Sequence, residues 1–275
     1  MMVPFWKNLS HLGLGDLEET DLFEEKKKAD KEKEAPLKEE DFLLDKVVRC
    51  PVCDQESTQK IMKTGKAKLL STDMDLRPKY EHVDIAKYEV YQCAFCGYAA
   101  LAKDFQKISL RQTAMIQEGI SSKVALKQYN GTTYSYEQSL ERHQLALASA
   151  MVKKAKTSEK AYICLKTAWL MRGYAESLEE QGEADRIQEI REGEQDFLEK
   201  AYQGFSKAVT EETFPISGMN EPTFDYLLAA LAIEVNRMDD ARRLVSNILQ
   251  STQTNPRAKD KARELKEIIL KAEKK

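Results

Sequence analysis

Two matching pairs of cysteines are the residues of this chain best suited to chemistry. Each pair places two residues between its thiols, as Cys50-Pro51-Val52-Cys53 and as Cys93-Ala94-Phe95-Cys96. This spacing allows a tight turn whose backbone amides point toward the sulfurs, and Gly97 supplies the positive φ that such a turn favours. A soft set of four thiolates favours Zn²⁺, with iron as an alternative. We therefore predict that Cys50, Cys53, Cys93 and Cys96 hold one zinc ion.

The chain between the two pairs is longer than in a compact zinc site. It holds 39 residues, 54–92, against roughly 15–20 in a compact two-pair site. We therefore expect an inserted hairpin or loop that includes residues 73–80. Four protein ligands leave no open position for water or substrate, so the predicted ion is structural. Metal binding, worth roughly 10–16 kcal/mol in small zinc peptides, would stabilise a module of about sixty residues whose own core is small.

Other roles for the cysteines stay open. A single Cys-x-x-Cys pair can be a thiol redox centre, but that chemistry uses one pair at the start of a helix in a βαβ setting, and two matched pairs fit a shared metal better. Oxidation that ejects the metal would make the cage a redox switch. We interpret Cys164, among apolar residues at helical spacing, as a small buried hydrophobe. We interpret His82, between the two pairs, as a solvated loop residue rather than a ligand.

The sequence contains no recognisable catalytic motif. It has no glycine-rich phosphate loop, no Ser/His/Asp order of a known type and no signature pair of carboxylates. The three histidines, His11, His82 and His143, do not lie at ligand spacing from one another. An enzyme is therefore the least favoured class, although an active site assembled in three dimensions from Asp, Glu, Tyr or Lys would leave no such signature.

Few glycines and prolines favour a mainly helical fold. The 275 residues include 11 Gly and 7 Pro, which leaves little room for a turn-rich all-β protein. Residues 47–108 contain short β-favouring runs and turn signals, and we predict a small β-rich, zinc-ribbon-like module there. Residues 109–275 carry apolar residues three and four apart, which predicts five or six consecutive antiparallel helices. Ser135, Thr157 or Ser158, and Asp239 are the predicted caps of three of them.

Two segments precede the predicted module. Residues 1–23 carry apolar residues at partly helical spacing, among them Phe5, Trp6 and Leu9. We interpret them as an amphipathic peptide that contacts the chain's own helices, a partner or a membrane surface. Residues 24–46 hold nine acidic and seven basic residues and few apolar ones, so we interpret them as a charged flexible linker.

Two of the predicted helices share a spacing of small and bulky residues. Ala201, Phe205 and Ala208 in one helix correspond to Ala241, Val245 and Ile248 in the other. A small residue lets a neighbouring helix approach closely, and the bulky residue fills the groove beside it. The pattern resembles the second helix of a tetratricopeptide repeat, so we predict antiparallel helical hairpins of this type over residues 109–275. An ordinary helical bundle of the same antiparallel order is the alternative.

Several runs together resemble a known family. They are Asp73-Met74-Asp75-Leu76-Arg77-Pro78-Lys79-Tyr80, the second cysteine pair continued as Gly97-Tyr98-Ala99-Ala100, the Cys-Pro-x-Cys pair at residues 50–53, and the helical run 158–166. In these the chain is similar to the uncharacterised bacterial family called domain of unknown function 2225, from about residue 42 to the last helices. Ala94 departs from the proline often found in the second pair. The resemblance implies a bacterial, cytosolic protein with a metal site and no established activity.

Charge and hydropathy bound the function. The balance of 43 Lys+Arg against 46 Asp+Glu argues against a dedicated nucleic-acid coat. No apolar stretch approaches the roughly 20 residues that cross a bilayer, and so few cysteines, mostly in two pairs, fit a reducing cytoplasm. We predict a cytoplasmic interaction or scaffold protein whose helical surface binds a protein or peptide partner. Nucleic-acid binding by the β-rich module is the alternative, because residues 47–110 hold ten basic residues, eight acidic ones and several aromatic ones.

Overall fold

The structure is a computed structural model that describes residues 12–15, 37–127, 129, 131–182, 184–252 and 254–272. The chain divides into two units, Met1–Leu37 and Lys38–Lys275. The predicted amino-terminal peptide (residues 1–23) lies outside the described residues except at 12–15, and the predicted linker (24–46) lies outside them up to residue 36. All elements that follow belong to the second unit.

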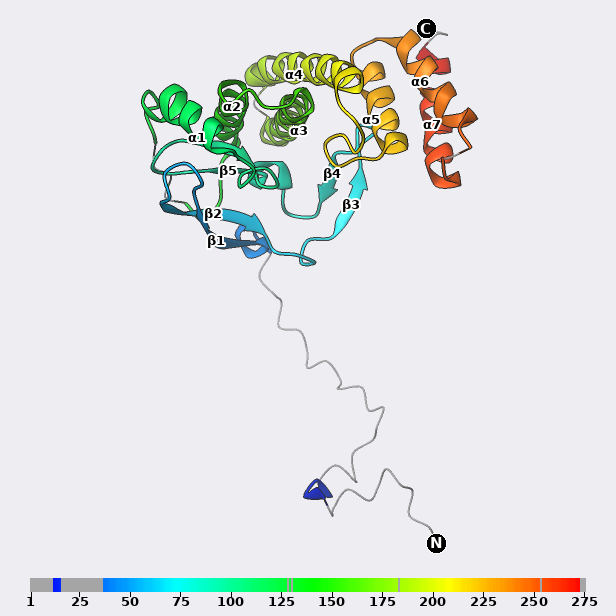
Figure 1. The fold of residues 1–275 in the computed structure, drawn as a ribbon. Coiled ribbons are helices and arrows are strands. Elements are labelled where there is room, and N and C mark those ends of the chain that lie inside the picture. The colour runs from blue at the N-terminus through cyan, green and yellow to red at the C-terminus, as the bar shows by residue number, and fades with distance from the viewer. Residues whose placement is uncertain are drawn as a thin grey trace. The chain divides into compact units, whose positions relative to one another are not determined.

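Most of the described chain is helical, which confirms the predicted mainly α character (Figure 1). The described residues hold seven α-helices: α1 (Leu110–Ile116), α2 (Tyr136–Val152), α3 (Thr157–Gln181), α4 (Ala184–Glu211), α5 (Glu221–Glu234), α6 (Met238–Gln250) and α7 (Pro256–Ala272). A π-helical turn, Gln117–Ser121, follows α1 and contains Gly119. The apolar periodicity therefore indicated a helical region correctly, but the described residues hold seven α-helices where five or six were predicted.

Side-chain capping agrees with the sequence at one predicted start and differs at two. Ser135 caps α2, and its side chain accepts from the Gln138 amide in a capping box. Helix α3 instead begins after Lys156, because the Thr157 and Ser158 hydroxyls donate to Glu211 and Glu212 at the end of α4. Helix α6 begins after Arg237 without a side-chain cap, and Asp239 pairs with Arg242 instead. Contacts with the end of α4 override the local preference at Thr157 and Ser158. At Asp239, an ion pair within the first turn of α6 takes the place of the cap.

Three two-stranded antiparallel sheets precede the helices. Strand β1 (Leu43–Arg49) pairs with β2 (Glu56–Met62), β3 (Leu69–Thr72) with β4 (Pro78–Tyr80), and β5 (Val90–Gln92) with β6 (Ala99–Leu101). The first and third hairpins carry the two cysteine pairs at their turns. The second hairpin is the insertion expected between the pairs.

The ordered chain begins earlier than the sequence indicated. A 3₁₀ turn over Glu39–Phe42 leads directly into β1, so residues 39–46 are not part of a free linker. Phe42 and Leu43 are both buried and pack in one apolar cluster with Val83, Tyr88 and Tyr134. Two buried apolar side chains are enough to fix a segment whose charge content alone predicts disorder.

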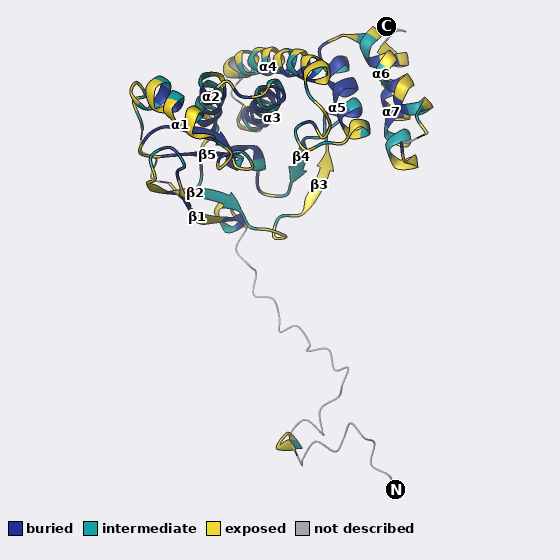
Figure 2. Cartoon of the chain, in the orientation of Figure 1, coloured by how far each residue is buried: buried dark blue, intermediate teal, exposed yellow. Residues whose placement is uncertain are grey.

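The helices pack in chain order. Figure 1 shows α2, α3 and α4 side by side and α5, α6 and α7 beside one another, and the neighbouring pairs are in contact. Helices α3 and α5 are buried over most of their length, as the dark blue ribbons of Figure 2 show. Ala201, Phe205 and Ala208 of α4 are fully buried against this core. Consecutive helices are thus in contact in chain order, and antiparallel, tetratricopeptide-like hairpins stay a prediction.

The cysteine-bearing hairpins pack against α2. Arg142 of α2 donates from Nη2 to the Val90 carbonyl at 2.9 Å and to Gln59 Oε1 at 2.6 Å. Gln59 on β2 also donates to the Gln92 carbonyl at 2.8 Å and accepts from the Gln92 amide at 3.1 Å. These buried bonds tie the first and third hairpins to each other and to the helices within one compact unit. The predicted boundary between residues 47–108 and 109–275 stays a prediction.

Candidate metal centre

The two cysteine pairs converge on one point. The sulfur atoms of Cys50, Cys53, Cys93 and Cys96 all lie within 4.8 Å of one another. Across the pairs, the Cys50 and Cys96 sulfurs are 3.6 Å apart, and those of Cys53 and Cys93 are 3.5 Å apart. Four thiols far apart in sequence are thus gathered into a cluster that could hold a metal ion.

The two turns have the same backbone design. The Val52 amide donates to Cys50 Sγ and the Phe95 amide donates to Cys93 Sγ, each at 3.4 Å. The residue after the second cysteine of each pair has positive φ: Asp54 in the first turn (64°) and Gly97 in the second (74°). This confirms the amide direction and the left-handed Gly97 that the spacing predicts. Asp54 accepts from Arg49 Nε at 2.7 Å, which ties the strained turn to the end of β1.

The separations of the sulfurs fit a tetrahedral ion. Zinc–sulfur bonds of about 2.3 Å imply sulfur–sulfur edges of about 3.8 Å, and the two measured pairs lie close to that value. Without a cation, the crowded sulfurs compete for negative charge: the pKa of Cys93 is lowered by the hydrogen bond from Cys50, whereas the pKa values of Cys50 and Cys96 are raised. A divalent cation would favour the thiolate form of all four. The donor set therefore fits a closed, four-sulfur metal site.

The other residues considered as ligands or nucleophiles lie elsewhere. His82 stacks on Phe42, with ring centroids 5.5 Å apart, and is not part of the cysteine cluster. Cys164 is buried in α3, and burial raises the pKa of its thiol to about 11. His143 is buried in α2, where its Nδ1 lies 2.8 Å from the Ser139 carbonyl oxygen. Cys164 is thus the small buried hydrophobe that its helical spacing predicts.

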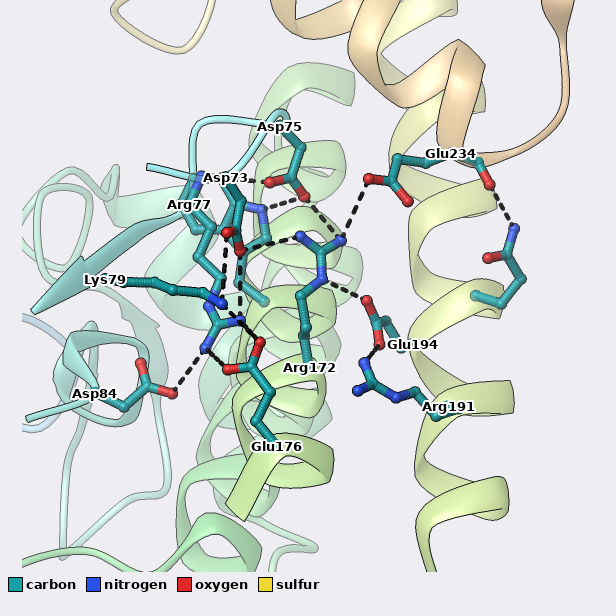
Figure 3. Close-up of polar contacts among 12 residues, drawn as sticks. Asp73, Asp75, Arg77, Lys79, Asp84, Arg172, Glu176, Arg191, Glu194 and Glu234 are labelled. Atoms are coloured by element: carbon teal, nitrogen blue, oxygen red, sulfur yellow. Dashed lines mark hydrogen bonds and ion pairs between the residues drawn. The ribbon is translucent and has the colours of Figure 1, made fainter. Parts of the chain in front are cut away.

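A second polar cluster, not foreseen from the sequence, joins the inserted hairpin to the helices (Figure 3). Asp75, at the turn between β3 and β4, is fully buried. Its Oδ2 accepts from Trp169 Nε1 at 2.9 Å and lies 3.0 Å from Arg172 Nη2. Its Oδ1 accepts from the Arg77 amide at 3.3 Å. A buried carboxylate is stable only when its oxygens are satisfied in this way.

Arg172 is the cation at the centre of this cluster. Besides Asp75, it contacts Glu194 of α4 at 2.6 Å, Asp73 at 3.5 Å and Glu234 of α5 at 4.0 Å. Burial alone would lower the pKa of Arg172, but the surrounding carboxylates raise it, led by Asp75. One guanidinium thus connects the hairpin to three helices.

Arg77, two residues after Asp75, forms the other half of the cluster. Its Nη1 and Nη2 donate to the two oxygens of Glu176 at 3.1 and 2.9 Å, a bidentate pair. Its Nη2 lies 3.6 Å from Asp84, and Lys79 also donates to Glu176, at 2.8 Å. Asp73, Asp75, Arg77 and Lys79 alternate along the hairpin. These charges at alternate positions were the sequence signal for the cluster. The signal does not identify the partners on the helices, which lie roughly a hundred residues further along the chain.

Fold and site together define a mainly helical protein with small antiparallel sheets and a four-cysteine cluster able to bind a metal ion. A comparison with protein families gives the same answer at the level of sequence. Residues 43–269 match the model of an uncharacterised protein family conserved in bacteria, domain of unknown function 2225. The chain therefore belongs to this family. No curated protein and no solved structure matches it.

Proposed function

We propose that the protein is a non-enzymatic interaction or scaffold protein of the cytoplasm, in which a structural zinc ion stabilises the hairpins and the helical surface binds a protein or peptide partner. The observation that carries the structural role is the closed cluster itself. All four positions of a tetrahedral ion would be taken by cysteine sulfurs, which leaves none for water or substrate.

The packing of the cluster supports a role in stability. Cys50, Cys93 and Cys96 are buried, and they pack in one apolar cluster with Tyr98, Phe105 and other residues. The strands of the third hairpin, β5 and β6, have three residues each, and β1 of the first hairpin, although seven residues long, buries only Leu43 and Val48. Such sheets bury little apolar surface, so an ion that joins two of them would supply stability that their own core lacks.

The arrangement of the helices supports the binding role. Successive helices are in contact, and Ala201, Phe205 and Ala208 of α4 are buried in the core that they form. A series of packed helices can present a long surface to a partner. Among the described residues, no helix has the length and apolar character that crossing a bilayer requires.

The nucleic-acid alternative gains less support from the structure. Tyr88, Tyr91 and Tyr98 are buried in the core and cannot stack on bases. Of the other aromatic residues considered for this role, Tyr80 is half-buried and Phe95, at the second cysteine turn, is 59% exposed. A single exposed ring is a small platform for binding single-stranded nucleic acid.

The proposal is tested in two parts. Full-length protein is purified under reducing, chelator-free conditions and its metals are counted by mass spectrometry. We expect one zinc ion per chain, and none in Cys93→Ser. The native chain is then used to capture partners, and each recovered protein is added back while amide hydrogen exchange is measured. A partner that protects amides of α3–α7 supports the proposal. Metal-free protein, or partners that protect only the hairpins, would refute the corresponding part.

A further inference from the structure

A wide groove lies where the inserted hairpin meets α3. Its volume is about 1010 Å³, and its walls come from β4, the chain that follows β4, the 3₁₀ turn before β1, Tyr136 at the start of α2, and the last two turns of α3. Figure 3 shows part of its floor, where Arg77, Lys79, Asp84 and Glu176 point toward one another. The groove is separate from the cysteine cluster and shares no residue with it.

Gly173 makes the floor of the groove possible. It lies within α3, and a Cβ at this position would be 2.1 Å from Asp84 Oδ2 and 2.9 Å from Arg77 Nη2. The Tyr136 hydroxyl, which donates to Asp84 at 3.1 Å, would be 3.2 Å from it. The missing side chain lets polar groups from three separate segments meet directly on the helix backbone.

The lining carries excess negative charge. Five carboxylates, those of Glu39, Asp84, Glu176, Glu179 and Glu180, face the three cations of Arg77, Lys79 and Lys87. The Arg172 cluster behind the floor adds four more carboxylates and two more arginines. Burial raises the pKa of Asp84. The lining carboxylates outnumber the lining cations even if Asp84 is counted as neutral. A hollow of this kind concentrates cations from solution.

The groove already holds one ammonium group of the chain itself. Lys87 Nζ lies 2.7 Å from both carboxylate oxygens of Glu39. It also lies 5.2 Å from the ring centroid of Tyr136 and 5.7 Å from that of Tyr88. A carboxylate combined with aromatic rings is a common means of binding an alkylammonium group. Glu180 at the exposed edge and Tyr80 in the wall provide the same two kinds of group for a second one, beside Glu179, which is paired with Arg191 at 2.9 Å.

We propose that this groove binds lysine side chains of a partner polypeptide. The inference rests on the proposed function and gives its partner a chemical class: a segment with a positively charged, lysine-bearing stretch. A free polyamine offers the same alkylammonium chemistry, so the experiment must separate the two sources.

Fluorescence anisotropy with the full-length chain tests the inference. The probe is a fluorescein-labelled octapeptide of alternating lysine and glycine, and its fully Nε-acetylated form is the neutral counterpart. We expect saturable binding of the lysine peptide that weakens with added salt, and at least ten-fold weaker binding of the acetylated peptide. Spermidine is added as a competitor. If spermidine displaces the labelled peptide at the same concentrations as the unlabelled peptide does, the claim that the ligand is a polypeptide is wrong.

Paired variants locate the site. The double variant Glu179→Gln/Glu180→Gln removes two exposed carboxylates of the groove, and we expect the lysine peptide to bind roughly five-fold more weakly, from the usual size of exposed charge pairs. Glu264→Gln/Glu267→Gln makes the same change on exposed positions of α7, outside the groove, and should leave binding unchanged. Equal affinities for the wild type and the groove variant would overturn the inference. In that event a captured partner that protects α3–α7 would still leave the proposed function standing.

Discussion

The sharpest prediction concerns Arg172→Met, which removes the central cation of the buried cluster and keeps a side chain of similar length. Asp75 would keep its bond from Trp169 but lose the Arg172 guanidinium 3.0 Å away. Glu194, which is 9% exposed, would lose its 2.6 Å contact at the same time. Breaking a buried ion pair from one side costs about 3–5 kcal/mol, because the remaining charge is left uncompensated. We expect a loss of that size in the free energy of unfolding.

A double-mutant cycle separates this electrostatic cost from lost packing. Asp75→Asn keeps the shape and removes the charge, and on its own it should cost about 1–3 kcal/mol. In the double variant the unpaired charge is gone, so the two losses should fall short of additivity by at least about 1 kcal/mol. Urea unfolding of zinc-loaded protein, followed by the fluorescence of Trp169 within the cluster, measures all four free energies.

The control is Arg263→Met on α7. Arg263 pairs with Asp260, but their side chains are 61% and 65% exposed, and such a pair contributes at most about 1 kcal/mol. If Arg172→Met costs no more than this control, or if the cycle is additive, the cluster does not hold the hairpin to the helices and our reasoning about it is wrong.

Three further predictions concern single buried residues. Burial lowers the pKa of His143 to about 4, so the folded protein binds fewer protons than the unfolded chain between about pH 4 and 6.5. The free energy of unfolding should therefore fall by up to about 3 kcal/mol as the pH drops through this range. In His143→Gln, the urea midpoint should vary less with pH across the same range. Helix propensity alone predicts that Gly173→Ala stabilises by roughly 1 kcal/mol, whereas contact of the new Cβ with Asp84 predicts a loss of about 1–3 kcal/mol; a raised melting temperature would contradict the packing of the groove floor. Cys164, buried and with its pKa raised to about 11, should not react with a disulfide reagent at pH 8 until the chain is unfolded, and fast labelling in the folded protein would contradict its burial.

The sequence was sufficient for features that depend on local pattern. The helices α2–α7 lie within residues 109–275, where apolar residues recur three and four apart. The Cys-x-x-Cys turns, with amides directed at sulfur and Gly97 in the left-handed region, also follow from spacing alone. Each of these features is set by residues within a few positions of one another.

Features set by distant contacts could not be read in advance. Thr157 has the chemistry of a helix cap, yet its hydroxyl donates to Glu211, 54 residues further along the chain. Residues 39–46 look like a charged linker until Phe42 meets its buried neighbours. The sequence does not predict the cluster around Arg172 for the same reason. The charged residues at alternate positions of the hairpin pair with residues of α3, which contacts α4 and α5 through Arg172, and all three helices lie far away in the sequence.

The inserted hairpin also determines the order in which parts of this chain can fold during synthesis. All four thiols have left the ribosome once Cys96 has emerged, so the cysteine cluster can form early, with or without an ion. The turn at Asp75 must wait longer: Trp169 comes 94 residues after it, and Glu234 is later still. Until those helices exist, the carboxylate gains nothing by leaving water. We therefore expect the four-cysteine cluster to assemble in the nascent chain while the inserted hairpin is still hydrated, and the hairpin to pack against the helices only after α5 has been made.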